Sequence, residues 1–254
     1  MRTVRAFLLS LACLLTLACL TGFPFDWLPD GILAAGRAYA QDTISPPAGS
    51  QETQPKLRIL AFGDSLTAGY GLSEAEGFTV QLAQALAKMG RPAEVINGGV
   101  SGDTTAGGLA RIDWALADKP QIVLLELGAN DMLRGLPPAA ARANLEQIIA
   151  KAKAANTAIL LIGMRAPANL GADYQRDFDA IYPDLAKAQD LPLYPFILDG
   201  VAGDPALNQA DGIHPNAEGV AIIVKRLLPS LVKVMDTVQP ADKPGASQSG
   251  SGAG

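Results

Sequence analysis

The sequence predicts an α/β protein in which a parallel, five-stranded sheet is covered by helices on both faces. Short apolar runs alternate along the chain with segments whose apolar residues recur at helical spacing. This alternation is typical of β-α-β units, which bury a parallel sheet between helices. Each of the first three runs is followed by a polar, Gly-rich stretch, and such sheets hold their ligands at the carboxyl ends of the strands. The 254 residues are enough for one sizeable core.

Five apolar runs have the length of buried strands, and five longer segments have the apolar spacing of helices. Trp114 and Phe78 fall within the predicted helices, where we expect them to belong to the core. The predicted strands are Leu57–Phe62, Ala93–Ile96, Ile122–Leu127, Ala158–Ile162 and Leu193–Phe196. The predicted helices are Phe78–Met89, Gly107–Leu116, Ala139–Ala155, Phe178–Ala188 and Ala217–Met235.

The N-terminus has the pattern of a cleaved signal peptide. Arg2 and Arg5 precede the apolar run Ala6–Leu20, and Ala38–Ala40 forms a small-x-small cleavage pattern. The run is at the short end for a membrane span, so we expect export to the periplasm or the medium and no stable membrane anchor. The predicted organisation is a signal peptide (1–40), a flexible linker (41–55), a folded domain (56–236) and a disordered tail (237–254).

Cysteine content and charge exclude several classes of function. Cys13 and Cys19 are the only cysteines, and both lie in the predicted signal peptide. Cleavage would leave no cysteine nucleophile, no Cys-ligated zinc site and no disulfide. The chain carries a net charge of −5, and the first forty residues, with three Arg and two Asp, account for +1 of it. An acidic protein without a basic run is a poor nucleic-acid binder, because phosphate neutralisation supplies most of that affinity.

The chain contains one histidine, His214. Imidazole is the side chain best suited to take a hydroxyl proton near neutral pH. Gly212 and Pro215 predict a tight turn around it, and Asp211 is near enough to orient the ring through Nδ1, as the third member of a catalytic triad does. Asn216 is better placed than Asp211 to cap the helix that follows.

Ser65 follows the first predicted strand, with Gly63 and Asp64 between them. A helix cap is its alternative role, but Gly63 and Asp64 before it and Ala68–Gly69 after it allow a sharp turn with space beside the hydroxyl. The last position of a Gly-x-Ser-x-Gly pattern is occupied by Thr67, which argues against an α/β-hydrolase elbow. Ser65 is therefore the candidate nucleophile, on a turn of another kind.

Acyl transfer from a serine also needs donors for the developing oxyanion, each worth about 3 kcal/mol. The candidates are the backbone N–H of Ser65, a backbone N–H within Ser101–Asp103 and the side-chain amide of Asn130. Each lies just past a different strand, so the three could converge at one edge of the sheet. The segment Gly98–Gly108 lacks the Gly-Lys-Ser/Thr of a nucleotide-binding loop.

Four short segments occur in a fixed order and are distributed over almost all of residues 57–235. They are Gly63–Leu66, Gly102, Gly128–Asp131 and Asp211–Pro215. This set resembles the conserved blocks of the SGNH, or GDSL-type, hydrolases. Ala129 stands where many relatives have Gly, which is a small change. The resemblance implies a flavodoxin-like α/β/α sandwich that works without a metal or a cofactor.

The resemblance also implies a role for each site residue. Ser65 would be the nucleophile, His214 the base and acid, and Asp211 the residue that orients His214. The oxyanion hole would consist of the N–H of Ser65, the N–H of Gly102 and the amide of Asn130.

Longer segments resemble a subgroup, the bacterial periplasmic acyl-CoA thioesterase, lysophospholipase and arylesterase enzymes. These segments are Gly63–Leu72, Val100–Thr104, Leu125–Gly135, Ile181–Pro183 and Asp211–Asn216. The subgroup implies hydrolysis of small-molecule carboxylic esters and thioesters through an acyl-enzyme, and we expect a monomer. In the family the stretch after the Asn-Asp pair forms a mobile wall of the acyl pocket, which here would comprise Met132, Leu133, Leu136 and Pro137.

Two other functions stay open. One is a carbohydrate O-deacetylase of the same superfamily, which a panel of p-nitrophenyl esters beside an acetylated sugar would distinguish. The other is a non-catalytic exported binding module, whose serine would not react with a fluorophosphonate. Asp64, Asp103 and Asp131 could suggest a metal cluster, but we expect them to bind loop backbone N–H groups. Arg134 has two candidate positions, the mouth of the pocket and the solvated surface, and we expect the second.

Overall fold

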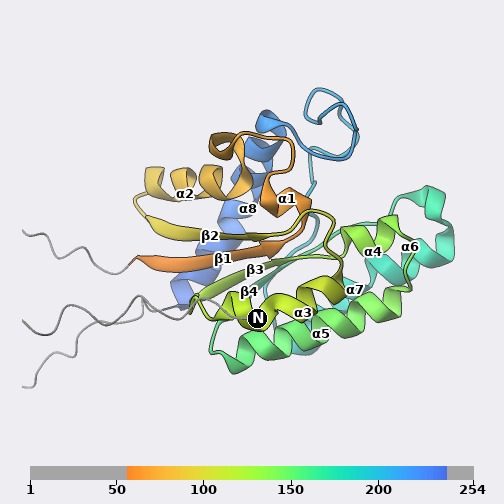
Figure 1. Cartoon of the computed structure of the whole chain (residues 1–254), viewed down its shortest axis with the longest axis horizontal. Helices are drawn as coiled ribbons and strands as arrows, with labels where there is room; N and C mark the ends of the chain where they lie inside the picture. Colours follow the sequence, from red (N-terminus) through yellow and green to blue (C-terminus); the bar gives the residue numbers. More distant parts are fainter. Residues whose placement is uncertain (1–55, 239–254) are drawn as a thin grey trace, which may run out of the picture. The chain divides into compact units, whose positions relative to one another are not determined.

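The computed structural model describes residues 56–238. The predicted signal peptide, the linker and nearly all of the predicted tail lie outside these residues. One parallel sheet has the strand order β2-β1-β3-β4-β5, which confirms the predicted fold class (Figure 1). The strands are β1 (Leu57–Gly63), β2 (Ala93–Gly99), β3 (Ile122–Glu126), β4 (Ala158–Ile162) and β5 (Leu193–Tyr194).

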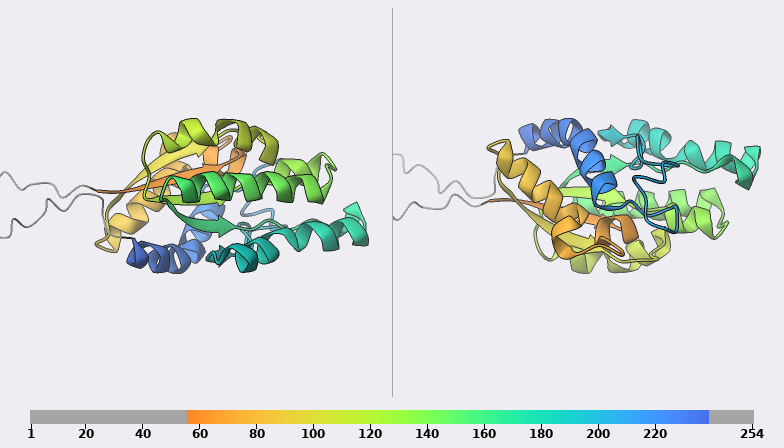
Figure 2. Two further views of the ribbon diagram at one scale, coloured as in Figure 1. Left: turned by 90° about the horizontal axis from the view of Figure 1, so that it is seen from below. Right: turned by 90° about the horizontal axis from the view of Figure 1, so that it is seen from above.

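Helices cover both faces of this sheet (Figure 2). The long helices α2 and α8 pack against each other on one face, and α3 packs against α5 on the other, where α7 also contacts α5. The α-helices are α1 (Ser65–Ala68), α2 (Phe78–Lys88), α3 (Thr105–Leu116), α4 (Ala129–Leu133), α5 (Pro138–Ala154), α6 (Ala172–Asp179), α7 (Ile181–Gln189) and α8 (Ala217–Thr237). Two short 3-10 helices are η1 (Glu74–Glu76) and η2 (Ala168–Leu170).

The strand order determines where a site can form. From β1 the chain crosses to β2 at one edge, and it then returns to place β3 on the other side of β1. The direction of winding reverses between β1 and β3, and ligands of open α/β sheets bind in the crevice at such a point. All five residues of β3 are buried because helices cover both faces of the sheet. The residues that follow β3 therefore pass from the core directly to this crevice.

Three predictions about elements were wrong in detail. The helix predicted over Phe178–Ala188 is two helices, α6 and α7, which meet at Ala180. Pro183 lies in the first turn of α7 and has no N–H to donate to Asp179, so one continuous helix would lose that bond. The strand predicted over Leu193–Phe196 ends at Tyr194, because Pro195 cannot donate a ladder hydrogen bond.

The third difference concerns β2, which runs three residues beyond its predicted end at Ile96. Its last residues pair with β1 as far as Gly63 and Gly99. Their polar, Gly-rich composition was typical of a loop, but Gly99 lies so close to α1 that a Cβ there would be 2.3 Å from the backbone N of Ala68. The glycine is therefore required by close packing within a strand.

Of the two aromatic residues predicted to be in the core, Phe78 is buried and Trp114 is 79% exposed. The buried face of α3 includes Gly108, Ile112 and Ala115. Trp114 follows Ile112 by two positions and so points away from that face. At the C-terminus, α8 includes Thr237, so the tail predicted from residue 237 starts within the helix. No helix within residues 56–238 is long and apolar enough to cross a membrane.

Candidate active site

Ser65 is the first residue of α1 and is separated from the carboxyl end of β1 by Asp64 alone. The turn is fixed by Asp64, whose side chain accepts a hydrogen bond from the N–H of Leu66 at 3.1 Å and so caps the helix. The short helix ends at Gly69, which has a φ of 80°. This local structure presents the Ser65 side chain at the crevice of the sheet.

A chain of contacts runs from Ser65 through His214 to Asp211. His214 Nε2 lies 2.9 Å from the Ser65 Oγ, and His214 Nδ1 lies 2.7 Å from Asp211 Oδ2. The second carboxylate oxygen of Asp211 accepts hydrogen bonds at 3.0 Å from the backbone N–H groups of Ile213 and His214. The structure therefore brings together the three residues predicted as a triad, although 149 positions separate the serine from the histidine.

The same contacts keep Asp211 ionised. The backbone N–H of His214, followed by its ring and the N–H of Ile213, lowers the pKa of Asp211 to about 2. A charged carboxylate on Nδ1 orients the ring so that Nε2 faces the serine. As predicted, Asn216 caps α8, since its side chain accepts the N–H of Gly219.

Tyr70 was not predicted as a site residue. Its ring centroid lies 4.7 Å from that of His214, with 39° between the ring planes. The backbone carbonyl of Tyr70 also accepts a hydrogen bond from Gln209, which in turn donates to Pro215 beside the histidine. Tyr70 therefore packs on the imidazole from the segment that follows α1. The aromatic residue between Gly69 and Gly71 was the sequence signal that could have indicated it.

The candidate oxyanion donors line the same cavity as Ser65. Asn130 lies in the first turn of α4, and its amide donates one hydrogen bond to Asp64 Oδ2 at 3.2 Å. A primary amide has two N–H groups, so the second remains for a ligand. Gly102 has a φ of 81°, a conformation that favours glycine. Among residues 56–238, the backbone N–H groups of Ser65 and Gly102 donate no hydrogen bond.

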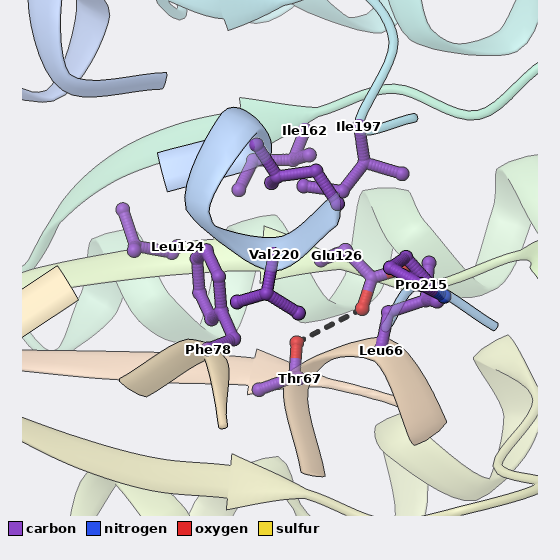
Figure 3. Close-up of a pocket in the computed structure, with 10 residues that line it drawn as sticks. Leu66, Thr67, Phe78, Leu124, Glu126, Ile162, Ile197, Pro215 and Val220 are labelled. Carbon is purple, nitrogen blue, oxygen red and sulfur yellow. Dashed lines mark hydrogen bonds between the residues drawn. The ribbon is translucent and has the colours of Figure 1, made fainter. Parts of the chain in front are cut away.

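Beneath the nucleophile lies a buried carboxyl group that sequence analysis missed. Glu126 ends β3, and its Oε2 accepts the Thr67 hydroxyl at 2.9 Å (Figure 3). The same oxygen accepts the Asp64 N–H at 3.3 Å. Apolar side chains, among them Phe78 and Val220, surround this contact at a small internal cavity of about 10 Å³. Burial raises the pKa of Glu126 well above its usual range, with Asp64 adding to the effect.

Asp64 is affected by the same environment. Burial raises its pKa to about 6, against the opposing effects of the Leu66 N–H, the charge of His214 and the Asn130 amide. Two buried carboxyl groups, Asp64 and Glu126, thus lie under the turn that carries Ser65. Like charges in a low dielectric disfavour each other, so ionisation of one of these carboxyl groups favours the protonated form of the other.

The loop aspartates act mainly as predicted. Asp64 binds a loop N–H as described above, and Asp131 accepts the N–H and the hydroxyl of Thr105 at 2.7 Å. Asp103 differs, because its carboxylate pairs with Arg111 at 2.7 Å. The same guanidinium donates to the carbonyls of Gly63 and Gly98, so Arg111 ties together the ends of β1 and β2. Among the described residues no three such side chains are arranged to hold a metal ion.

The cavity beside Ser65 has a volume of about 490 Å³. Met132 and Leu133 line it, as predicted for the pocket wall, whereas Leu136 and Pro137 are not among the lining residues. Pro137 occupies the position before the first residue of α5, and the carbonyl of Leu136 accepts the Tyr174 hydroxyl, so both belong to the turn into that helix. Large apolar side chains that the sequence patterns do not indicate also line the cavity: Tyr70, Met164, Phe196, Leu198 and Ile213.

The fold and this chain of contacts are those of a serine hydrolase on an α/β sheet. Comparison with known proteins gives the family. The model of the GDSL-like Lipase/Acylhydrolase family matches residues 61–222. The chain is 40% identical over 174 residues to the esterase TesA of Pseudomonas aeruginosa. The aligned residues make up 68% of this chain and 87% of the relative.

Two further proteins agree with this result. The chain is 43% identical over 201 residues to the thioesterase 1/protease 1/lysophospholipase L1 of Escherichia coli (strain K12), covering 79% of this chain and 86% of the relative. The crystal structure of AlinE4, an SGNH-hydrolase family esterase, is 51% identical with a TM-score of 0.60, covering 71% and 97% of the two chains. The protein therefore belongs to the GDSL-like lipase and acylhydrolase family, the SGNH hydrolases, and is a hydrolase of ester bonds.

Proposed function

We propose that this protein is an exported serine hydrolase that cleaves carboxylic esters and thioesters of small acyl or aryl groups through an acyl-enzyme on Ser65. The chain Asp211–His214–Ser65, with contacts of 2.7 and 2.9 Å, carries this proposal. The apolar lining of the adjacent cavity suits an acyl chain. The names of the relatives, esterase and thioesterase 1/protease 1/lysophospholipase L1, support the same range of substrates.

In the proposed reaction His214 Nε2 takes the proton of the Ser65 hydroxyl as Oγ attacks the acyl carbon. Asp211 holds Nδ1 and stabilises the imidazolium that forms. The resulting oxyanion is bound by the N–H groups of Ser65 and Gly102 and by the second N–H of the Asn130 amide. His214 then protonates the leaving alcohol or thiol. Water repeats the sequence on the acyl-enzyme, which releases the acid and restores Ser65.

The whole protein would then consist of an export signal in residues 1–40 followed by an enzyme that acts as a monomer. It acts on small acyl substrates and needs no nucleic acid and no stable membrane anchor. The acidic composition and the order of charges and apolar residues at the N-terminus support this.

The replacement Ser65→Ala tests the proposed nucleophile. We expect kcat on a p-nitrophenyl ester to fall by about 10⁴ or more, because the attacking oxygen is lost, while the melting temperature stays close to that of the wild type. A fluorophosphonate probe should label the wild-type protein and not the variant. Ser230→Ala, on α8, is the matched control and should label normally. Hydrolysis that survives Ser65→Ala would overturn the assignment.

A further inference from the structure

The arginines of this protein fall into two groups. Residues 56–238 contain eight, and six of them contact a carboxylate within 4 Å. Arg134 and Arg165 are the two that have no carboxylate partner among the described residues. The paired arginines are Arg58, Arg91, Arg111, Arg142, Arg176 and Arg226.

Both unpaired arginines lie at the active-site cavity. Arg165 lines it, and its guanidinium lies over the ring of Phe196, another lining residue, at 5.4 Å from the ring centroid. Arg134 donates to the carbonyl of Gly102 at 2.7 Å, and Gly102 also lines the cavity. These contacts hold each guanidinium without neutralising it, since an aromatic face and a carbonyl carry no net charge.

The acidic groups nearby are already engaged. Asp64, the acidic residue in the cavity lining, is buried and binds Leu66 and Asn130. Asp211 is held by His214, and Asp179 accepts the N–H of Ala166, the residue after Arg165. Arginine does not lose its proton in proteins, so the cavity has two permanent, uncompensated positive charges at its edge.

The positions of these charges indicate which part of a substrate they meet. The buried or half-buried wall of Met132, Met164 and Phe196 suits the acyl chain. Arg134 and Arg165 are exposed, so they lie where a substrate stays in contact with water. With the acyl group in the cavity and the ester at Ser65, that exposed part is the leaving group.

We propose that Arg134 and Arg165 form an anion-binding rim that recognises a phosphate on the leaving group, so that the two residues determine specificity among esters and thioesters. This inference rests on the proposed function of the same site. The planar guanidinium donates paired hydrogen bonds to phosphate oxygens, which a neutral leaving group does not offer.

Two thioesters with the same acyl group test the proposal. Octanoyl-CoA has a leaving group, coenzyme A, that carries phosphates. S-octanoyl-N-acetylcysteamine has the same thioester, but its leaving group has no phosphate. In the purified protein, Arg165→Gln and the double variant with Arg134→Gln should lower kcat/KM for octanoyl-CoA by about tenfold or more, mainly through KM. With Arg165→Gln alone the neutral thioester should change less than about twofold, and added salt should narrow the difference between the substrates.

Arg91→Gln is the matched control, because it removes an equal charge at the opposite ends of the strands, just before β2. It should leave the ratio of the two substrates unchanged. An equal loss on both thioesters with Arg165→Gln, or no loss on octanoyl-CoA, would overturn the anion-binding rim while leaving the proposed function intact. A wild-type protein that hydrolyses neither thioester would instead refute the thioesterase function, and this inference with it.

Discussion

Asp64 connects three parts of the active site through its own atoms. One carboxylate oxygen caps α1, which carries Ser65, and the other orients the amide of Asn130. Its backbone N–H donates to Glu126 at the end of β3. The position of the nucleophile and that of an oxyanion donor are therefore set by one buried residue. This arrangement explains why an aspartate between Gly63 and Ser65 is useful for chemistry in which it does not itself react.

The buried carboxyl group of Glu126 should make the free energy of unfolding depend on pH. Burial raises its pKa, so the folded protein keeps a proton that the unfolded chain releases near pH 4.5. The stability associated with that proton is present below this pH and is lost as the pH rises towards the pKa of the folded state. Glu126→Gln cannot ionise, and it can still accept the bonds from Thr67 and Asp64.

We therefore expect the free energy of unfolding of Glu126→Gln, relative to wild type, to increase between about pH 5 and pH 8 by about 1 kcal/mol or more. Urea unfolding at a series of pH values measures this difference. Asp64 titrates over part of this range and interacts with Glu126, so the difference reports the ionisation of the pair. A difference that stays constant over the whole range would show that Glu126 is ionised in the folded protein.

Sequence patterns identified some site residues and missed others for a physical reason. Ser65, Asp211 and His214 stand in short motifs whose members are neighbours in the chain or follow a strand. Glu126 contacts residues 59 and 62 positions away, and in the sequence it is only a single acidic residue near the end of the predicted strand Ile122–Leu127. Tyr70 was missed because its stacking on the imidazole depends on the fold and not on any spacing.

At the scale of elements, the turn between β3 and α4 has little tolerance for change. Gly128 has a φ of 123°, and a Cβ there would lie 2.3 Å from the hydroxyl of Tyr182. That hydroxyl is buried and donates to the carbonyl of Leu127 at 2.9 Å, so it cannot easily move. Asn130 follows two residues later, and its orientation depends on this turn.

Gly128→Ala should therefore destabilise the protein by about 2–4 kcal/mol and also lower kcat, since the oxyanion donor moves. Thermal unfolding and ester hydrolysis measure the two effects. Gly90→Ala is the matched control: its φ is 73°, but no atom lies within 4 Å of the added Cβ. It should cost about 1 kcal/mol and leave kcat unchanged. Equal effects of the two substitutions would show that the clash with Tyr182 is unimportant.

The elements themselves were largely predictable, because buried strands and amphipathic helices leave strong periodic signals. The errors occurred where backbone chemistry or packing overrode the pattern. Pro183 divides the predicted helix into α6 and α7. The strand β2 continues to Gly99, whose missing side chain leaves room for α1 to pack against the strand. Trp114 was placed in the core by its residue type, whereas the buried face of α3 excludes it.

At the scale of the whole molecule, the order of strands and helices determined the fold class, since alternating elements leave few arrangements other than a parallel sheet. The family match covers most of this folded part. The N-terminal forty residues carry a separate prediction. If they are a cleaved signal peptide, the protein recovered from an exporting bacterium should begin at Gln41, as mass spectrometry would show.

The replacement Ala40→Lys should block this cleavage and leave a chain that retains the signal peptide, because the cleavage site requires a small residue. Export can be followed in the same cells by fractionation. Recovery of both proteins with their first forty residues intact would contradict the predicted signal peptide.

The presence of a single histidine has a practical consequence for studying the enzyme in solution. In a proton NMR spectrum, every imidazole resonance of the protein comes from the ring between Ser65 and Asp211. No assignment by mutation is needed, and the protonation of the general base can be followed directly as acyl groups enter and leave the serine. The molecule thus carries its own spectroscopic reporter at the reacting atoms.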